Sequence, residues 1–172
     1  MAFAKSFTKE KLVVGCLISR ESMLMQMRAA LAESFGPIDF ESESLPFDYT
    51  HYYDDEMGTP IQRIFLAFRS LLSPDLLAEA KSKTNAIENL FRVDGKRKIN
   101  LDPGCMSLSR FMLATTKEGA FRIPLHSGIY AEVTLVFEKG KFRSLEWTYP
   151  DYKSLPYCKI LKKIRNIYKT QL

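Results

Sequence analysis

The sequence predicts an α+β fold in a single domain, and three observations support this class. The 172 residues are 46% hydrophobic and 26% charged, which is the composition of an ordinary globular protein. In the first half, apolar runs of strand type alternate with segments of helical periodicity. The second half consists mainly of alternating strand-like runs before a last amphipathic helix. A chain of this length can bury a stable hydrophobic core without disulfides or structural metals, so we expect one domain over residues 1–172.

Hydrophobic periodicity in the first half predicts the order β-α-β-β-α-β. The apolar run that begins at Lys11 is nearly continuous, as in a central strand covered on both faces. We expect Ser19 or Ser22 to cap the first helix, and Gly36 to end it. The predicted elements are strand 11–19, a helix up to 36, strands 38–47 and 61–71, a helix from Ser73-Pro74 to Asp94-Gly95, and a strand from 96.

Two segments between these elements have the chemistry of turns and loops. Pro103 and Gly104 fit the central positions of a type II turn, so the strand from residue 96 is predicted to break after Asp102. Segment 48–60 is too polar for a core element and too aromatic for a linker. We therefore expect 48–60 to be an ordered loop that covers part of the molecule.

The second half predicts a hairpin and a C-terminal helix. Segment 110–117 is compatible with helix or strand, and its Thr pair favours strand. Residues 128–150 form two alternating runs joined at Lys139-Gly140, which predicts a hairpin. The apolar side of the last helix is predicted to consist of Tyr157, Ile160, Leu161, Ile164 and Tyr168.

This order of elements matches a ferredoxin-like, split βαβ core with an added antiparallel hairpin and a C-terminal amphipathic helix. A doubly wound parallel sheet is the alternative. It is the weaker prediction, because the second half lacks the helices that such a sheet requires.

Charge and cysteine usage limit the class of protein. The net charge is +5, and the last helix carries basic residues without an acidic one: Lys159, Lys162, Lys163, Arg165 and Lys169. This face could bind nucleic acid or an anionic membrane surface, although such faces are usually just solvated.

Three scattered cysteines without metal-ligand spacing argue against disulfides and zinc, so we expect a cytoplasmic protein. No apolar stretch is long enough to span a bilayer, and the phosphate-binding P-loop pattern is absent.

The hairpin geometry gathers a candidate site on one face of the sheet. If Lys139-Gly140 is a two-residue turn, Glu132 lies opposite Trp147, and the same register brings Tyr149 to that face. A carboxylate among aromatic rings requires a cation or hydrogen bonds, and we expect Lys117 and Arg122, from the segment just before the hairpin, to supply the cation. Asp102 and Asp151 would complete a polar floor in an aromatic-rimmed cleft. Alternatively, Trp147 and Tyr149 pack under the last helix and Glu132 makes a purely structural ion pair.

Several blocks of the sequence resemble a known family. The blocks are INLDPG (99–104), LATTK (113–117), GIYAEVTL (128–135) and WTYPDY (147–152), together with FDYTHYYDDEMG (47–58). They are similar to the signature blocks of the bacterial DUF4416 family, a domain of unknown function, over nearly the whole chain. Cys105 departs from the family, whose members have Tyr after Asp-Pro-Gly. Some members carry a GTP-binding label, which the absent P-loop does not support.

The resemblance falls on the same residues as the hairpin geometry, with Tyr152 in addition, and implies a site there. We expect a cleft for a small anionic or nucleotide-like molecule, in which Lys117 and Arg122 neutralise charge and Trp147 or Tyr149 stacks. Glu132 or Asp102 would orient polar groups or act as a base, with Asp151 and Tyr152 as further ligand contacts. No metal site is predicted, and the sequence identifies no particular cofactor. The second hypothesis is a non-catalytic module that binds a protein or nucleic acid through the basic helix.

Overall fold

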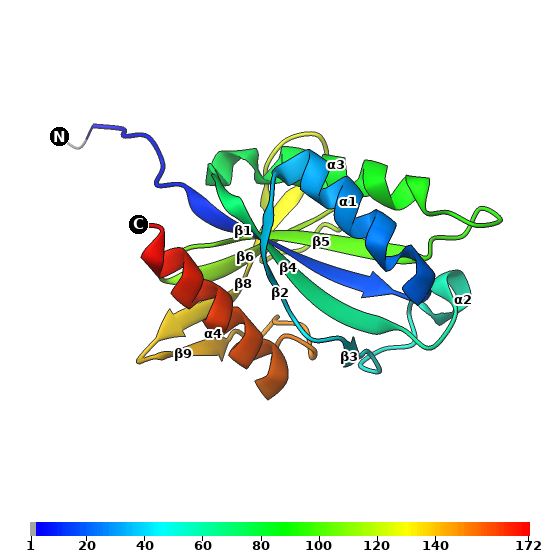
Figure 1. The fold of residues 1–172 in the computed structure, drawn as a ribbon. Coiled ribbons are helices and arrows are strands. Elements are labelled where there is room, and N and C mark those ends of the chain that lie inside the picture. Colours follow the sequence, from blue (N-terminus) through cyan, green and yellow to red (C-terminus); the bar gives the residue numbers. More distant parts are fainter. Residues whose placement is uncertain (1–2) are drawn as a thin grey trace.

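All strands in the described part of the chain belong to one antiparallel sheet. The computed structural model describes residues 3–172 and gives the strand order β2-β4-β1-β5-β6-β8-β7, with β3 beside β4 and β9 beside β8 (Figure 1). Every strand pair is antiparallel, so the doubly wound parallel alternative is wrong. The α+β class is confirmed.

The strands and helices have the following bounds. The strands are β1 (Glu10–Ile18), β2 (Ile38–Glu41), β3 (Leu45–Pro46), β4 (Gln62–Leu72), β5 (Ile99–Met106), β6 (Arg110–Thr115), β7 (Ile123–Pro124), β8 (Tyr130–Glu138) and β9 (Lys141–Ser144). The helices are α1 (Leu24–Phe35), α2 (Asp54–Met57), α3 (Leu77–Leu90) and α4 (Leu155–Thr170). No helix within residues 3–172 combines the length and the apolar character needed to cross a bilayer.

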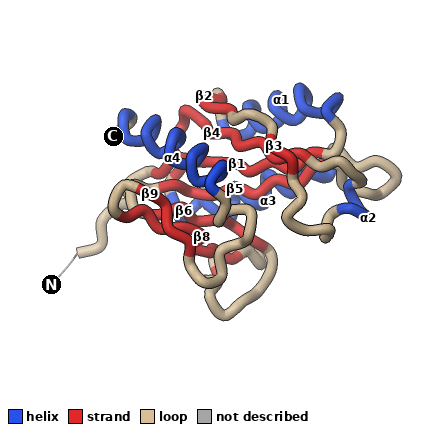
Figure 2. Tube along the Cα trace, turned by 90° about the horizontal axis from the view of Figure 1, so that it is seen from below, coloured by secondary structure: helices blue, strands red, loops and turns tan. Residues whose placement is uncertain are grey.

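Helices cover both faces of the sheet. Figures 1 and 2 show α1 and α3 on one face and α4 on the other. β1 lies between β4 and β5 and is buried along its whole length, which confirms a central strand. Its Val14 and Cys16 belong to the core under α1 and α3, whereas Val13 belongs to the core under α4. The five apolar residues predicted for the inner side of α4 are all buried.

Some predicted boundaries of the first two helices are wrong. Neither serine caps α1, since a 3-10 turn precedes this helix and the Ser19 hydroxyl instead donates to the Met57 carbonyl at 2.7 Å. Gly36 does end α1, with φ of 88°. α3 ends at Leu90, before Asp94 and Gly95, which form a separate tight turn with φ of 51° and 75°.

The hairpin is present but shorter than predicted. Lys139 and Gly140 have positive φ, and Phe137 pairs with Phe142 on either side of them, as a two-residue turn requires. Segment 110–117 contains β6, as the strand interpretation predicts. β9 ends at Ser144, however, so the predicted pairing of Glu132 with Trp147 is wrong.

Candidate functional site

The sheet divides between β5 and β6, and a cavity occupies the fork. The two strands pair from Met106–Phe111 to Gly104–Leu113, and there the pairing stops although β6 continues to Thr115. A cavity of about 820 Å³ lies in the space between the separated strand ends. Residues of α3, of the loop 47–56 and of the turn 149–152 form its other walls.

Side chains of α3 form hydrogen bonds with the backbone groups of β5 that do not pair with β6. The Leu101 N–H donates to Glu88 Oε1 at 2.7 Å, and the Leu101 carbonyl accepts from Lys81 Nζ at 2.8 Å. Pro103 points to the same edge as Leu101, because backbone groups two residues apart share an edge. Pro103 has no N–H, so it fits at a point where no strand partner accepts one.

The predicted turn at Asp102-Pro103-Gly104 is therefore wrong. All three residues lie in β5, where Pro103 pairs with Val14 and Gly104 with Val13 of β1. Gly104 is required for packing, since a Cβ there would lie 2.6 Å from the Met112 carbonyl oxygen. The Pro-Gly pair thus marks the end of the β5–β6 ladder.

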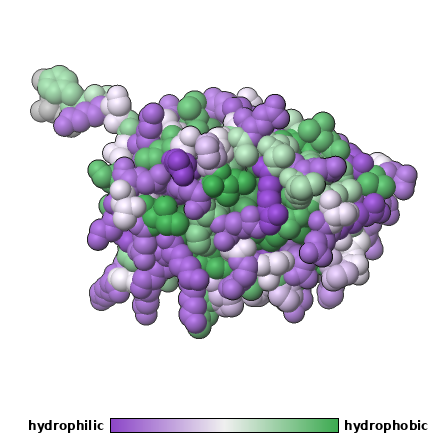
Figure 3. Space-filling model, in the orientation of Figure 1, coloured by the Kyte–Doolittle hydropathy of each residue, from purple (hydrophilic) through white to green (hydrophobic). Residues whose placement is uncertain are grey.

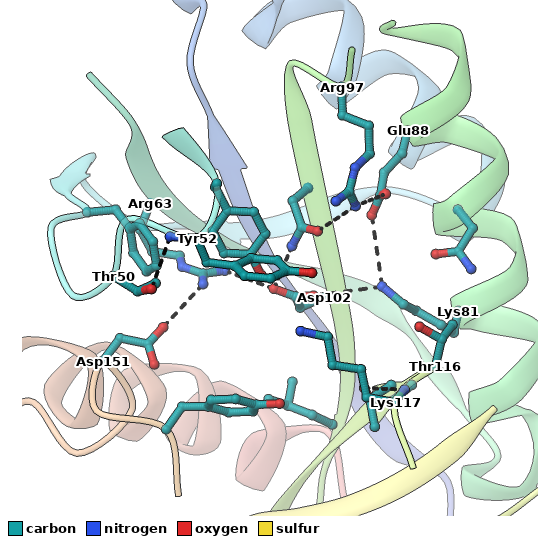
Figure 4. Close-up of a pocket in the computed structure, with 18 of the residues that line it drawn as sticks. Thr50, Tyr52, Arg63, Lys81, Glu88, Arg97, Asp102, Thr116, Lys117 and Asp151 are labelled. Carbon is teal, nitrogen blue, oxygen red and sulfur yellow. Dashed lines mark hydrogen bonds and ion pairs between the residues drawn. The ribbon is translucent and has the colours of Figure 1, made fainter. Parts of the chain in front are cut away.

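A chain of alternating charges crosses the floor of the cavity (Figure 4). Its members, in order, are Glu56, Arg97, Glu88, Lys81, Asp102, Arg63 and Asp151. Successive charged groups lie 2.7, 3.1, 3.9, 3.7, 3.4 and 3.2 Å apart. The chain joins the loop 47–56, α3, β5, β4 and the turn 149–152, so it fixes the walls of the cavity relative to one another.

Arg63 is the deepest cation of this chain. Its side chain is 3% exposed, and its guanidinium lies 5.3 Å from the ring centre of Phe47 and 5.9 Å from that of Tyr152. Gly15 of β1 makes room for it, since a Cβ at Gly15 would lie 2.8 Å from Arg63 Nη1 and 2.9 Å from the Tyr152 hydroxyl. The glycine inside the first strand is explained by this close approach.

Burial raises the pKa of three carboxyls around the cavity. These are Glu88, Glu132 and Asp151, and in each the loss of hydration outweighs the opposing effect of the nearby cation, which is Lys81, Arg122 and Arg63 respectively. Glu56 behaves oppositely, because hydrogen bonds from Arg97 lower its pKa.

Arg122 holds together the wall that carries Lys117. Its Nε donates to Glu132 Oε2 at 2.9 Å, and its Nη2 donates to the Tyr149 hydroxyl at 2.7 Å. Its Nη1 donates to the carbonyls of Lys117 and Glu118. The predicted ion pair of Glu132 with Arg122 is present, but Arg122 does not itself line the cavity.

Lys117 lies at the mouth of the cavity. It extends toward Asp102 (Figure 4), and its Nζ lies 4.3 Å from the ring centre of Tyr52. Within residues 3–172, no carboxylate lies within 4 Å of this ammonium group. Tyr52 comes from segment 48–60, so the predicted loop does border the cavity.

The structure brings six of the eight predicted site residues to one cavity. These are Asp102, Lys117, Glu132, Tyr149, Asp151 and Tyr152. Trp147 lies elsewhere, because its Nε1 donates to the Val133 carbonyl and its ring stacks on Phe121. Trp147 and Tyr149 are 37% and 38% exposed, so the alternative that buries them under α4 is also wrong.

Sequence reasoning missed the residues that β4, α3 and the turn after α3 contribute. They are Arg63, Lys81, Asn85, Glu88, Asn89 and Arg92, with Arg97 and Asn100 from the segment that leads into β5. Two signals were available in the sequence. Arg63 is the charged residue closest to the start of the apolar run 61–71, and Gly15 interrupts a strand of larger apolar residues.

The histidines lie apart from the cavity. His51 contacts Asp54, and His126 contacts Glu79. Among residues 3–172, no group of three or more potential metal ligands is close enough to hold an ion.

Comparison with known proteins gives a family and no activity. No curated protein matches the chain, and no solved structure does. A family model described as "Domain of unknown function (DUF4416)" matches residues 8–168. The chain therefore belongs to the DUF4416 family.

Proposed function

We propose that the protein binds a small anionic or nucleotide-like molecule in the cavity between β5 and β6. The volume of about 820 Å³ falls within the range of small-molecule sites. The observation that carries the proposal is Lys117, a cation at the mouth that no carboxylate of the described chain neutralises. The three cations of the floor, Arg63, Lys81 and Arg97, are by contrast already paired with carboxylates.

The geometry supports distinct roles for the predicted residues. Lys117 would contact the anionic group directly. Arg122 and Glu132 would act indirectly, by holding the segment that carries Lys117 and the ring of Tyr149. Glu132 is 1% exposed, so it is a poor candidate for a base. The Asp102 side chain is 25% exposed and is the group we propose to orient, or deprotonate, a ligand hydroxyl.

The arrangement of the first elements supports a ferredoxin-like core as part of this proposal. The strands β2, β4, β1 and β5 are neighbours in this order, α1 follows β1, and α3 follows β4. Both helices pack on the same core. A split βαβ unit has this order and this one-sided placement of helices.

A reducing, cytoplasmic location is the environment we propose. The cysteines Cys16, Cys105 and Cys158 are all free, and the first two are buried. Free buried thiols are typical of proteins in reducing compartments.

The basic helix supports a second candidate function, the binding of nucleic acid. Lys159, Lys162, Lys163 and Lys169 of α4 are exposed. Hydrophilic side chains project from the region of α4 and β9 in Figure 3. If this face binds nucleic acid, retention on a nucleic-acid column should fall with salt and disappear when these four lysines are replaced by Gln.

A thermal-shift screen of phosphates, nucleotides and anionic metabolites tests the first proposal. A bound compound should raise the midpoint temperature of unfolding in a concentration-dependent way. Lys117→Ala should abolish this shift, whereas Lys83→Ala, at an exposed position of α3 outside the cavity, should retain it. The proposal fails if no compound of a broad panel stabilises the protein, or if Lys117→Ala responds like the parent chain.

A further inference from the structure

The side of the cavity formed by α3 presents uncharged amides between two cations. Lys81, Asn85, Asn89 and Arg92 line the cavity at spacings of three or four residues, so they share one side of the helix and of the turn that follows it. Asn89 accepts a hydrogen bond from Arg92 at 3.1 Å. No side-chain hydrogen bond of Asn85 is found within residues 3–172, and this side chain is half-buried.

Asp102, on the floor beside Lys81, retains hydrogen-bonding capacity. Its Oδ2 accepts from Arg63 and, at 2.9 Å, from Asn100. Its Oδ1 lies 3.7 Å from Lys81 Nζ, beyond hydrogen-bond range. A carboxylate oxygen on the floor and an amide on the α3 side of the same cavity suit hydroxyl groups, because a hydroxyl can donate to the first and accept from the second.

The aromatic walls are less suited to a nucleobase. Lys117 covers one side of the Tyr52 ring, and Tyr53 packs edge-on against Tyr52 at 5.0 Å. The other lining rings pack against one another or against Arg63, with the exception of Tyr149. Trp147, the best stacking ring in the chain, lies against Phe121 outside the cavity.

The free charges of the cavity are positive. Lys117 and Arg92 both line it, and neither has a carboxylate within 4 Å in residues 3–172. The floor chain carries four carboxylates and three cations, so these two cations leave the floor and the mouth together with a net charge of +1, which favours an anion such as a phosphate monoester.

We propose that the ligand is a phosphorylated sugar or a related phosphorylated polyol. Lys117 binds the phosphate, and Asn85 and Asp102 bind hydroxyls. This inference rests on the proposed function, since it names the class of molecule that the same cavity accepts.

Calorimetric titration of the full chain with matched compounds tests the ligand class. The probes are glucose 6-phosphate, ribose 5-phosphate and fructose 1,6-bisphosphate, with free glucose, inorganic phosphate, AMP and GMP for comparison. At least one sugar phosphate should bind at least tenfold more tightly than free glucose, inorganic phosphate and either nucleotide.

Two substitutions separate the hydroxyl contacts from the phosphate contact. Asn85→Ala should weaken sugar-phosphate binding by about three- to tenfold, as expected for one neutral hydrogen bond, and leave inorganic phosphate unaffected. Lys117→Ala should weaken the binding of sugar phosphates and of inorganic phosphate by about tenfold or more, as expected for the loss of one hydrogen bond from a charged group. Asn166→Ala, at an exposed position of α4, is the control and should change neither.

The failures of the two proposals differ. If AMP or GMP binds more tightly than every sugar phosphate and Lys117→Ala abolishes that binding, the sugar-phosphate inference is wrong and the proposed function stands. An Asn85→Ala variant that binds sugar phosphates as the parent does would also overturn the inference. If neither these probes nor the broad anion panel binds, both proposals fail.

Discussion

Glu88 on α3 accepts a hydrogen bond from the backbone N–H of Leu101 on β5 at 2.7 Å, so a helix side chain takes the place of a neighbouring strand. The same carboxylate lies 3.1 Å from Arg97 and 3.9 Å from Lys81. It therefore connects the free edge of β5 to the ion-pair chain on the floor of the cavity.

Replacing Glu88 should destabilise the fold strongly. Glu88→Ala leaves the Leu101 N–H without an acceptor and removes one of the two carboxylates beside each of Arg97 and Lys81, and we expect a loss of about 2–4 kcal/mol in the free energy of unfolding. Urea denaturation measures it. Glu79→Ala, on the exposed side of the same helix, is the control and should stay within about 0.5 kcal/mol of the parent. A loss of similar size in both variants would contradict the role of Glu88.

Glu132 should contribute a specific pH dependence. Its raised pKa means that the folded chain binds this proton more tightly than the unfolded chain, whose Glu has an ordinary value near 4.5. The stability gained from protonation is complete below that value and is lost as pH rises through the raised pKa. The lowered pKa of Glu56 changes the stability with pH in the opposite direction, so the prediction concerns the difference in pH profile between the parent and a Glu132 variant.

Glu132→Gln should thus show a smaller decline of the free energy of unfolding than the parent as pH rises above 4.5. Urea denaturation at a series of pH values measures this decline. Glu138→Gln, at an exposed position near the hairpin turn, should keep the parental pH profile. Parallel profiles for the parent and Glu132→Gln would show that burial does not perturb this carboxyl.

Gly15 should not tolerate a methyl group. In Gly15→Ala the new Cβ meets Arg63 Nη1 and the Tyr152 hydroxyl within 3 Å, and we expect a loss of about 1–3 kcal/mol from overpacking. Gly119→Ala is a matched control, because the nearest atoms to its new Cβ lie 3.5 Å away or farther. Thermal and urea unfolding of the two variants measures the difference. Equal stability of both would refute the close packing at Gly15.

Arg122 and Glu132 should be energetically coupled. Their side chains are 9% and 1% exposed, so removing one partner leaves a buried charge and should cost about 3–5 kcal/mol. The double variant Arg122→Ala/Glu132→Ala should cost clearly less than the sum of the single variants. A double-mutant cycle from urea denaturation measures the coupling. Additive losses would mean that Arg122 and Glu132 do not stabilise each other, and would contradict the prediction.

Local patterns predicted the elements whose environment is regular. The continuous apolar run of β1 and the apolar stripe of α4 indicate burial through the spacing of apolar residues. The Lys139-Gly140 turn is predicted from its residue types, which suit the positive φ of a two-residue hairpin turn. Six of the site residues were found because the hairpin and the family blocks lie close to the cavity.

The fork in the sheet could not be predicted in this way, because side chains of α3, distant in the sequence, replace β6 as hydrogen-bond partners of β5. Pro103-Gly104 has the local chemistry of a turn, yet in the structure it marks the point where β6 separates from β5. Trp147 illustrates the same limit. Because β9 ends at Ser144, Trp147 lies beyond the hairpin and contacts Phe121 and the backbone of β8 instead of Glu132.

The hydrogen bonds from α3 to the Leu101 backbone also have a consequence for solubility. Unpaired strand edges are templates on which other chains add, and β5 would present one inside the fork if Lys81 and Glu88 did not occupy its hydrogen-bonding groups. The residues that shape the cavity thereby also keep this edge from pairing with the strand of another chain. A chain that loses them risks aggregation before it loses its fold.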